Sequence, residues 1–401
     1  LELVEKKDKI KKRLAKARPA RVAPNLKNED MKLNIAVLAG DGIGPEITQQ
    51  SIKVLKAIAE RFDHEFLFEE AVVGASAIDL TENPLPDATL DLCKKSDAVL
   101  FGAIGDPKYD NNPAAKVRPE QGLLKLRKEL GLFANIRPVR AFERLLKHSP
   151  LRPDRIEGAD MVIYRELTGG IYFGEKTLSE DERKASDLCV YTAEEIERMT
   201  HLAFEAAQKR RNKVTLVDKA NVLETSRLWR RTVKEIAKDY PDVELNFLYV
   251  DNAAMQMIIN PKQFDVILTE NMFGDIISDE ASVIGGSIGL LASASVGTEH
   301  ALFEPIHGSY PQAAGKGIAN PIASILSAAM LLEHFNLLEE AAIIQAAVDK
   351  SLEMNICTSD INKESSYSTE KVGTFIEGLI LDNEDLKING DNLSLGQATI
   401  I

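Results

Sequence analysis

The chain has 401 residues, of which 44% are hydrophobic and 28% charged, a composition typical of a globular protein that is too long for one small core. The net charge of −13 argues against a nucleic-acid-binding surface, and no run of about 18 apolar residues predicts a membrane-spanning helix. Three widely spaced cysteines, Cys93, Cys189 and Cys357, form no paired metal or redox motif and suit a reducing compartment. We therefore expect a two-domain cytoplasmic protein without nucleic-acid or membrane partners.

Residues 1–30 differ from the rest of the chain because they are crowded with Lys and Arg. They lack the apolar stretch of a secretory signal, and their scattered acids do not suit a mitochondrial transit peptide. We interpret them as a basic N-terminal extension that is poorly ordered; a basic arm that binds a partner is the alternative. The folded core is expected to begin at Met31.

Apolar runs and helical periods alternate from there onward. The first apolar run ends in a glycine-rich turn and is followed by helical spacing over residues 45–62. Strands are predicted at 32–40, 97–105, 161–167, 213–220, 244–251 and 264–271. Further helices are predicted at 87–95, 193–210, 225–238 and 275–285. This alternation predicts an α/β sheet with many parallel strands, in which ligands bind beyond the strand ends.

The turn "GDGIGPE" at residues 40–46 invites comparison with a dinucleotide-binding fingerprint. It contains Gly40, Gly42 and Gly44, but Pro45 interrupts the G-x-G-x-x-G spacing. Two interpretations remain open, a structural turn with proline near the start of a helix, or a loop next to a cofactor.

Acidic residues stand within the apolar stretch "TENMFGDIISDEASVIGG" at 269–286. Asp275 and Asp279 are four residues apart, so a helix would place both carboxylates on one face. Complementation of the helix dipole is the simpler explanation. If Asp251, at the end of a predicted strand, joins them, three carboxylates would need a cation, and oxygen ligands suit Mg²⁺ or Mn²⁺.

Other polar residues follow apolar segments in the same way. Arg127, Arg137 and Arg165 could bind carboxylates in two-point geometry, although most arginines form surface ion pairs. Tyr172 could donate a proton or simply pack, and Lys219 could be a general base or a solvated side chain.

Among the six histidines, only His307 has a suggestive setting. It precedes a glycine-rich loop that contains Lys316 and Asn320 and that could wrap around a nucleotide.

Seven motifs occur in a fixed order: GDGIGPE, GLLKLRKELGLFANIRPV, RELTGGIYFGE, DKANVLETSRLWR, YVDNAAMQ, TENMFGDIISDEAS and EPIHGSYPQAAGKGIANP. Together they resemble the isocitrate/isopropylmalate family of β-decarboxylating dehydrogenases. The resemblance covers residues 31–380 and implies the two-domain open α/β fold of that family, with a shared mixed sheet and no Rossmann fold. Domain 1, on the cofactor-binding side, would comprise 31–132 and 287–385; domain 2, with the metal, substrate and dimerisation surfaces, would comprise 133–286; and 386–401 would be a C-terminal tail.

The resemblance also implies roles for individual residues. Lys219 would take the proton of the C2 hydroxyl, through a water molecule, and Tyr172 would protonate the enol carbon. Metal ligands for Mg²⁺ or Mn²⁺ would be Asp251, Asp275 and Asp279, with Asp251 and Lys219 supplied by the second subunit of a homodimer. Substrate contacts would be made by Arg127, Arg137, Arg165, Leu123, Leu124, Val222 and Asp251. NAD would be bound by Glu120, Asn221, His307, Gly308, Ser309, Ile318 and Asn320.

The reaction implied is oxidative decarboxylation of (2R,3S)-3-isopropylmalate to 2-oxoisocaproate and CO₂ with reduction of NAD, in leucine biosynthesis. Isocitrate-specific members carry a Ser-Asn pair where this chain has Leu123 and Leu124, which together with Val222 favour an isopropyl group. Gln312 replaces an acid that favours NAD over NADP, so discrimination between the cofactors is expected to be weaker. Alternatives are a related decarboxylase acting on tartrate, malate or homoisocitrate, and a non-catalytic, metal-stabilised binding protein.

Overall fold

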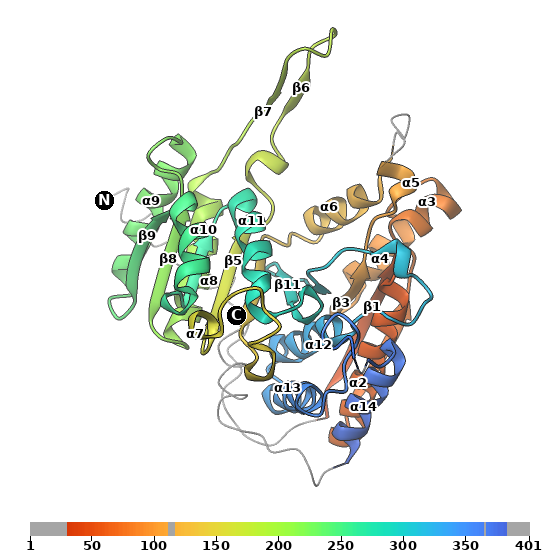
Figure 1. Ribbon diagram of the computed structural model, residues 1–401. Helices are drawn as coiled ribbons and strands as arrows, with labels where there is room; N and C mark the ends of the chain where they lie inside the picture. Colours follow the sequence, from red (N-terminus) through yellow and green to blue (C-terminus); the bar gives the residue numbers. More distant parts are fainter. Residues whose placement is uncertain (1–29, 111–116, 365, 383–401) are drawn as a thin grey trace.

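A computed structural model gives the fold and describes residues 30–110, 117–364 and 366–382 (Figure 1). The chain forms two lobes, and one large sheet runs through both of them (Figure 1). Apart from residue 30, the predicted basic extension and the predicted C-terminal tail from residue 386 lie outside the described residues. No helix in the described part is long and apolar enough to cross a membrane.

The sheet has ten strands in the order β2-β1-β3-β12-β11-β4-β5-β10-β8-β9. Neighbouring strands are parallel except in the middle, where β11 is antiparallel to β12 and β4, and β4 is antiparallel to β5. The strands are β1 (Lys32–Gly40), β2 (Glu65–Glu70), β3 (Ala98–Ala103), β4 (Ala134–Arg140), β5 (Asp160–Glu166), β8 (Lys213–Asp218), β9 (Glu244–Tyr249), β10 (Val266–Thr269), β11 (Ala292–Val296) and β12 (Ala301–Pro305). The predicted α/β fold with a mixed sheet is confirmed, while the proposed domain boundaries stay a prediction because the sheet is continuous across them.

One face of the sheet is covered across both lobes, and a single apolar cluster spans it. In one lobe the cover consists of α2 (Gly44–Phe62), α12 (Ile322–His334), α13 (Leu338–Glu353) and α14 (Thr369–Leu381). In the other lobe it consists of α8 (Ala193–Gln208) and α9 (Glu224–Ile236). Burial of this surface provides the main hydrophobic stabilisation of the fold.

The opposite face is covered by two separate apolar clusters, one in each lobe. The first is formed with α4 (Asp87–Lys95) and α6 (Pro119–Glu129), near the short helices α3 (Ala75–Thr81) and α5 (Pro107–Asp110). The second is formed with α7 (Pro153–Ile156), α10 (Val250–Ile259) and α11 (Asn271–Ala281). A two-stranded arm, β6 (Lys176–Leu178) and β7 (Ala185–Asp187), extends away from the second lobe (Figure 1). The sheet between the two clusters is therefore free to present polar side chains.

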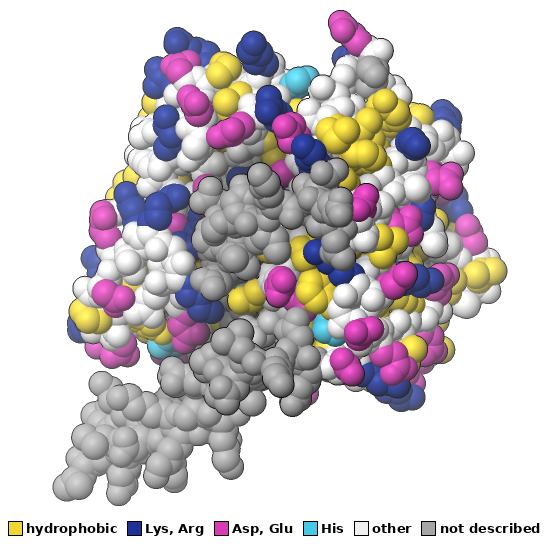
Figure 2. All heavy atoms as spheres, turned by 90° about the horizontal axis from the view of Figure 1, so that it is seen from below, with side chains coloured by type: hydrophobic (Ala, Val, Ile, Leu, Met, Phe, Trp, Pro, Cys, Tyr) yellow, Lys and Arg dark blue, Asp and Glu magenta, His cyan; other side chains and the backbone are white. Residues whose placement is uncertain are grey.

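Side-chain alternation along the central strands places Asn135, Arg137, Ser293, Ser295 and Glu304 on this part of the sheet, which we call the polar floor. On β4, Ala134 and Ile136 belong to the continuous apolar cluster, whereas Asn135 and Arg137 point to the other face. On β11, Ala294 faces the apolar cluster and the two flanking serines face the floor. On the face of the molecule shown in Figure 2, acidic and basic side chains are interspersed.

Two predicted element boundaries were wrong in ways that matter for the site. Helix α11 begins at Asn271, four residues before the predicted start, because the Glu270 side chain caps it by accepting the Phe273 N–H at 3.1 Å. Asp251 does not end a strand but lies in the first turn of α10, because the chain turns into a helix directly after Tyr249.

Candidate active site

A cavity of about 130 Å³ lies over the polar floor. It is lined by Phe101, Gly102, Ala103, Ile104, Leu123, Arg127, Arg137, Ser293, Glu304, Pro305, Ile306, His307 and Gly308. Five of these residues are substrate or cofactor contacts predicted from the sequence: Leu123 and Arg127 on α6, Arg137 on β4, and His307 and Gly308 after β12. The cavity is the starting point for the candidate site.

Arg127, in the last turn of α6, reaches the floor through an ion pair. Its Nη2 lies 2.6 Å from the Oε1 of Glu304 on β12, and both side chains are almost buried. A buried charge needs a partner, so Glu304 allows α6 to place a guanidinium beside the apolar Leu123 at the cavity wall.

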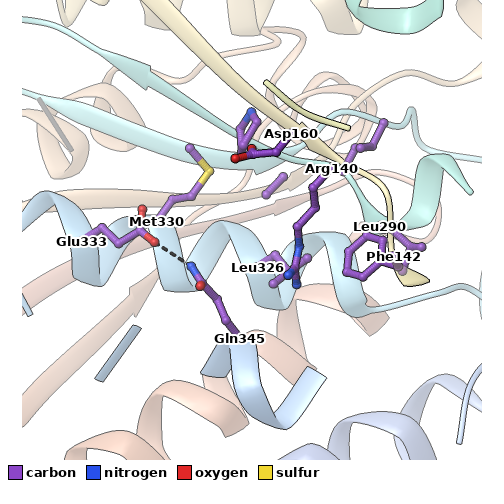
Figure 3. A pocket seen from close by; sticks show the side chains of 11 residues that line it. Arg140, Phe142, Asp160, Leu290, Leu326, Met330, Glu333 and Gln345 are labelled. Carbon is purple, nitrogen blue, oxygen red and sulfur yellow. Dashed lines mark hydrogen bonds between the residues drawn. The ribbon is translucent and has the colours of Figure 1, made fainter. Parts of the chain in front are cut away.

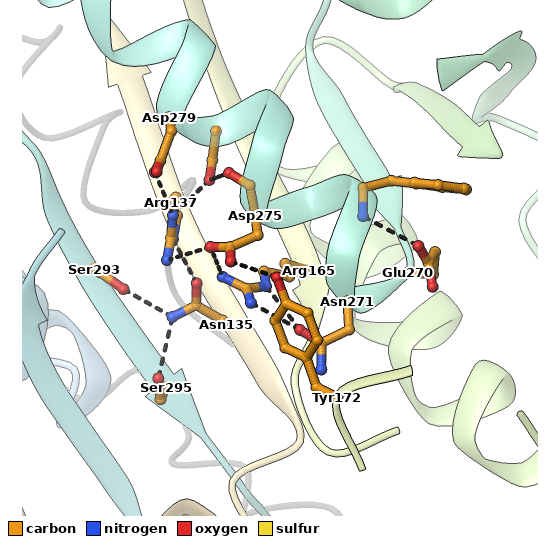
Figure 4. Close-up of polar contacts among 12 residues, drawn as sticks. Asn135, Arg137, Arg165, Tyr172, Glu270, Asn271, Asp275, Asp279, Ser293 and Ser295 are labelled. Atoms are coloured by element: carbon orange, nitrogen blue, oxygen red, sulfur yellow. Dashed lines mark hydrogen bonds and ion pairs between the residues drawn. The ribbon is translucent and has the colours of Figure 1, made fainter. Parts of the chain in front are cut away.

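Arg137 is held at its inner end and faces acids at its outer end (Figure 4). Its Nε donates to Asn135 Oδ1 at 2.7 Å, and its Nη1 donates to Ser278 Oγ at 2.5 Å and to Asp279 Oδ1 at 3.2 Å. Its Nη2 lies 3.7 Å from Asp275 Oδ1. Burial lowers the pKa of Arg137, and the two aspartates oppose that change. The predicted sharing of one helix face by the two aspartates is confirmed, since both reach one guanidinium.

Arg165, at the end of β5, is anchored by α11. Its Nε and Nη2 donate to Asn271 Oδ1 at 3.0 and 2.8 Å, and its Nη1 donates to Asp275. Burial, followed by repulsion from Arg137, lowers the pKa of Arg165 to about 10. Its guanidinium remains charged at neutral pH, so the arginines and the α11 aspartates form one compact ionic cluster.

Tyr172 joins the same cluster from a short 3-10 turn, Gly170–Tyr172. Its hydroxyl donates to Asp275 Oδ2 at 2.9 Å. Burial, with a further contribution from this hydrogen bond, raises the pKa of Tyr172 to about 12. Gly170 has φ +72°, and a Cβ there would lie 2.3 Å from the Tyr191 hydroxyl, so the turn requires glycine. Tyr172 is thus a neutral phenol that can donate a proton at neutral pH.

The carboxylates of Asp275 and Asp279 are suited to a hard divalent cation. Their side chains are 34% and 61% exposed, so both carboxylates are accessible to solvent. Burial raises the pKa of Asp279, although Arg137 opposes this effect. Two oxygen donors with room for water match the preference of Mg²⁺ or Mn²⁺.

A second pair is formed by Lys219, directly after β8, and Asp251, in the first turn of α10. The Lys219 Nζ lies 2.5 Å from Asp251 Oδ1, and this hydrogen bond lowers the pKa of Asp251. Within the described ranges, no group of three His, Cys, Asp or Glu side chains is close enough together to hold a metal. Asp251 therefore does not complete a site with Asp275 and Asp279 inside one chain.

The predicted cofactor loop packs against the glycine-rich turn after β1. The Ile43 N–H donates to the Ser309 carbonyl at 2.8 Å. Gly42 has φ +59°, and a Cβ there would lie 2.0 Å from the same carbonyl, so glycine is needed for this close approach. The turn is thus adjacent to the loop in which the resemblance places NAD contacts.

The side chains of that loop have different environments. The Nε2 atom of His307 is buried and makes no hydrogen bond within the described residues, and burial lowers the pKa of His307. Asn320 is turned inward, where its Nδ2 donates to Asp360 at 3.0 Å and its Oδ1 accepts the Ile322 N–H. Ile318 and Gln312 are exposed. His307 consequently has a free ring nitrogen for a ligand, whereas the Asn320 side chain is already used by the fold.

The remaining predicted contacts are dispersed. Glu120, in the first turn of α6, places its Oε1 close to Gly105. Leu124 and Val222 are 37% and 61% exposed and do not line the cavity, and Asn221 is exposed beside Val222. The structure of one chain therefore brings only Leu123 of the three predicted apolar substrate contacts to the cavity.

Several site residues were missed by the sequence reasoning. They are Asn135, Asn271, Ser278, Ser293, Ser295 and Glu304. The strict alternation in "ANIRPVR" and "ASASV" was the available signal, because polar residues at every second position of a central strand indicate a polar patch on one sheet face.

A second cavity, of about 60 Å³, lies on the other face, between β4, β5 and the helices α12 and α13 (Figure 3). Its lining is largely apolar, and Gln345 Nε2 donates to Glu333 Oε1 at 2.7 Å within it. None of the predicted site residues lines this cavity.

Comparisons with known proteins identify the family of the chain. The family model for isocitrate/isopropylmalate dehydrogenase matches residues 34–376. Proteins named 3-isopropylmalate dehydrogenase from Bacteroides fragilis and Bacillus subtilis are 56% and 53% identical, over 86% of this chain and 98% and 96% of theirs. The crystal structure of isocitrate dehydrogenase from Methylococcus capsulatus has a TM-score of 0.79 at 36% identity, over 87% of this chain and 100% of that one. A β-decarboxylating dehydrogenase from Thermococcus kodakarensis has a TM-score of 0.72 at 38% identity, over 87% and 96% of the two chains.

Proposed function

The chain belongs to the isocitrate/isopropylmalate dehydrogenase family, and we propose that it oxidises and decarboxylates 3-isopropylmalate to 2-oxoisocaproate and CO₂ with NAD, as a step of leucine biosynthesis. The observation that carries the substrate assignment is the cavity wall, where apolar Leu123 stands beside Arg127 and Arg137. Two arginines suit the two carboxylates of a malate, and leucine suits an alkyl substituent rather than a third carboxylate.

The ionic cluster supports substrate binding by charge and shape. Arg127, Arg137 and Arg165 can donate planar pairs of hydrogen bonds to carboxylates. Each is already held by a residue of the floor or of α11, so little side-chain entropy is lost when the substrate binds. These arginines would orient the C2 hydroxyl and the C3 carboxylate in the cavity.

A divalent cation fits the exposed oxygens of Asp275 and Asp279, together with Asp251 of a second copy. When bound, Mg²⁺ or Mn²⁺ supplies positive charge that stabilises developing negative charge on oxygen. The cofactor NAD, which accepts the hydride, would contact Glu120, Asn221 and the loop that includes His307, Gly308, Ser309, Ile318 and Asn320.

Proton transfer is assigned to two residues of the chain. Lys219 is proposed to remove the proton of the C2 hydroxyl as the neutral amine, after its ammonium has passed a proton to water, while the Asp251 carboxylate beside it orients the side chain. Tyr172 is proposed to protonate carbon C3 after CO₂ leaves, because its raised pKa keeps the phenol protonated. The Asp275 carboxylate orients the Tyr172 hydroxyl.

We propose a homodimer in which each site takes Lys219, Asn221, Val222 and Asp251 from the partner chain. Two observations support this proposal. Within the described residues, one chain brings no three carboxylates close enough together to hold a metal, and the second lobe exposes apolar side chains. Met255, Ile258 and Ile259 on α10 and Ile276 on α11 are 43–57% exposed, and solvent-exposed apolar patches of this kind typify association surfaces. The arm adds Leu178, which is 61% exposed.

A cytoplasmic location is also proposed. It is supported by Cys93, Cys189 and Cys357, which are all free thiols in the structure.

The proposed function is tested by NADH formation from purified protein with Mg²⁺ and a panel of 2-hydroxy acids. Rapid turnover with 3-isopropylmalate and NAD, and slow turnover with isocitrate, homoisocitrate, tartrate and malate, is the expected result. The same panel with NADP measures the effect of the exposed Gln312. Failure to reduce either cofactor with any acid would favour a binding protein over an enzyme.

A further inference from the structure

We propose that Asn135 is a positioning residue, which fixes the Arg137 guanidinium for a substrate carboxylate and is itself oriented by Ser293 and Ser295. This inference rests on the proposed function, because it assigns Arg137 to substrate binding. It concerns a contact inside the polar floor that is shown in Figure 4.

The orientation of the Asn135 amide is set by its neighbours. Its Nδ2 donates to Ser293 Oγ at 2.8 Å, Ser295 Oγ at 3.1 Å and the Ala294 carbonyl at 3.3 Å. Its Oδ1 accepts the Arg137 Nε–H at 2.7 Å. The reversed amide would place an NH₂ group against the guanidinium donor and lose this bond, so only one orientation satisfies all partners.

Strand register brings these residues into one row. Asn135 is paired with Ser295 of antiparallel β11 on one side and with Arg165 of antiparallel β5 on the other. Arg137 lies two residues further along the same strand and so projects from the same face. Asn135 and Ser295 are completely buried, which means that water cannot replace a lost partner easily.

The neutral amide has a specific advantage over an acid. Arg127 is anchored by the carboxylate of Glu304 and Arg165 by that of Asp275, so part of each positive charge is already compensated. Arg137 already faces Asp275 and Asp279 at its outer end, and Asn135 holds its inner Nε without adding a third negative charge. The direction of the guanidinium is thereby fixed by a neutral group, and its partial pairing with the two aspartates can be exchanged for a substrate carboxylate.

Two substitutions of Asn135 separate hydrogen bonding from shape. Asn135→Leu keeps a similar volume but removes every hydrogen bond, and Asn135→Asp keeps the shape and the acceptor but adds a competing charge. Both should raise KM and the calorimetric Kd for isopropylmalate by roughly ten- to a hundred-fold, since hydrogen bonds to charged groups are the strong ones. kcat should change only a few-fold, because uniform binding is lost. Malate should be affected equally, since it carries the same carboxylates.

The matched control is Ser51→Ala, which breaks the buried Ser51–Ser324 hydrogen bond of 2.7 Å between α2 and α12, away from the floor. It should lower the melting temperature without changing KM. If wild-type protein forms no NADH from isopropylmalate, the proposed function fails. If the wild type is active and Asn135→Leu has a wild-type KM and Kd, the positioning role is overturned.

If Asn135→Leu does not fold, substitution of Ser293 and Ser295 tests the positioning role instead. The Ser293→Ala/Ser295→Ala double variant leaves the amide only its contact with the Ala294 carbonyl. It should raise KM roughly three- to ten-fold beyond Ser293→Ala alone, through loss of the anchoring hydrogen bond. Equal KM values for the single and double variants would contradict the inference, because Ser295 does not line the cavity.

Discussion

Each arginine of the site is paired with a nearby acidic side chain, which explains how three arginines can lie at a largely buried part of the sheet. Arg127 pairs with Glu304, Arg165 with Asp275, and Arg137 with Asp279. Desolvation of an unpaired charge would cost several kcal/mol, so each acid stabilises the fold as well as the site. Binding of substrate and cation would exchange these internal partners for ligand partners.

The division of proton transfer between two residues can be tested by rapid kinetics. Lys219→Ala should abolish the burst of NADH, because removal of the hydroxyl proton precedes hydride transfer. Tyr172→Phe should retain a fast burst and then turn over slowly. Each loss in steady-state rate should be about 10²–10⁴-fold, the usual contribution of general acid or base assistance. If Tyr172→Phe eliminates the burst while Mn²⁺ still binds, Tyr172 acts before or during hydride transfer.

Metal affinity should depend on pH through Asp279. Its pKa is raised above the ordinary 3.8 by partial desolvation, with a smaller contribution from the charge of Asp275, so protons compete with the cation at higher pH than for an unperturbed aspartate. As pH falls toward this raised pKa, the neutral acid forms and Mn²⁺ affinity declines. Calorimetric titration of Mn²⁺ across the acidic range should reveal this loss. Asp279→Asn should bind more weakly and show a flatter pH profile; an unchanged profile would exclude Asp279 as the titrating ligand.

At the scale of elements, the site depends on where helices α6 and α11 end and begin. They come from opposite lobes; α6 supplies Arg127 from its last turn, and α11 supplies Asp275 and Asp279. The start of α11 is fixed by Glu270, and its next residue, Asn271, accepts hydrogen bonds from Arg165. The cap therefore sets the position of Asp275 and Asp279 relative to the strands.

Loss of the α11 cap should be visible in stability measurements. Glu270→Ala removes the acceptor for the Phe273 N–H and should destabilise the protein by about 0.5–2 kcal/mol, as N-cap deletions do. Burial raises the pKa of Glu270, so the folded state holds its proton more tightly than the unfolded state. The contribution of this group to stability thus decreases as pH rises from its unfolded to its folded pKa.

The isosteric variant Glu270→Gln keeps an acceptor and carries no charge. Thermal unfolding at several pH values should show a smaller loss for Glu270→Gln than for Glu270→Ala, and a weaker pH dependence than in the wild type. Equal losses in the two variants would mean that the capping hydrogen bond is not what positions α11.

At the scale of the whole molecule, the proposed site residues fall into two halves within one chain. In the first half Tyr172 contacts Asp275, and in the second Lys219 pairs with Asp251 at the start of α10, where apolar side chains are exposed. Within the described residues the three aspartates do not form one cluster. A two-fold dimer would place the second half of one chain against the first half of the other, and it would bury those apolar side chains.

Subunit complementation tests this arrangement directly. Lys219→Ala and Tyr172→Phe homodimers should each be nearly inactive. After mixing and subunit exchange, each heterodimer would contain one intact site and one doubly defective site. Equal mixing should restore roughly a quarter of the wild-type activity, because half of the dimers are hybrids with one working site each. Activity that stays at the level of the separate variants despite proven exchange would place both residues in the same chain's site.

The local pattern of the sequence determined most helices and strands, and its motifs indicated the fold class and the reaction. Residues 32–40 and 87–95 form the strand and helix predicted for them, because periods of two and of 3.6 residues are local properties. Asp275 and Asp279 share a face for the same reason. The motifs that carry the family resemblance are likewise contiguous stretches, so the fold class and the reaction could be inferred without coordinates.

Only the tertiary structure decided which distant residues meet on the floor. Asn135 and Ser293 are 158 positions apart, and Arg127 and Glu304 are 177 apart. Their contacts depend on the register of β4, β11 and β12, and register is fixed by the pairing of whole strands and the burial of one sheet face. The start of α11 was misplaced because capping by Glu270 depends on where β10 ends. Local spacing therefore indicated the arginines, Asp275 and Asp279, but it did not indicate the other partners of the arginines, which are Asn135, Asn271, Ser278 and Glu304.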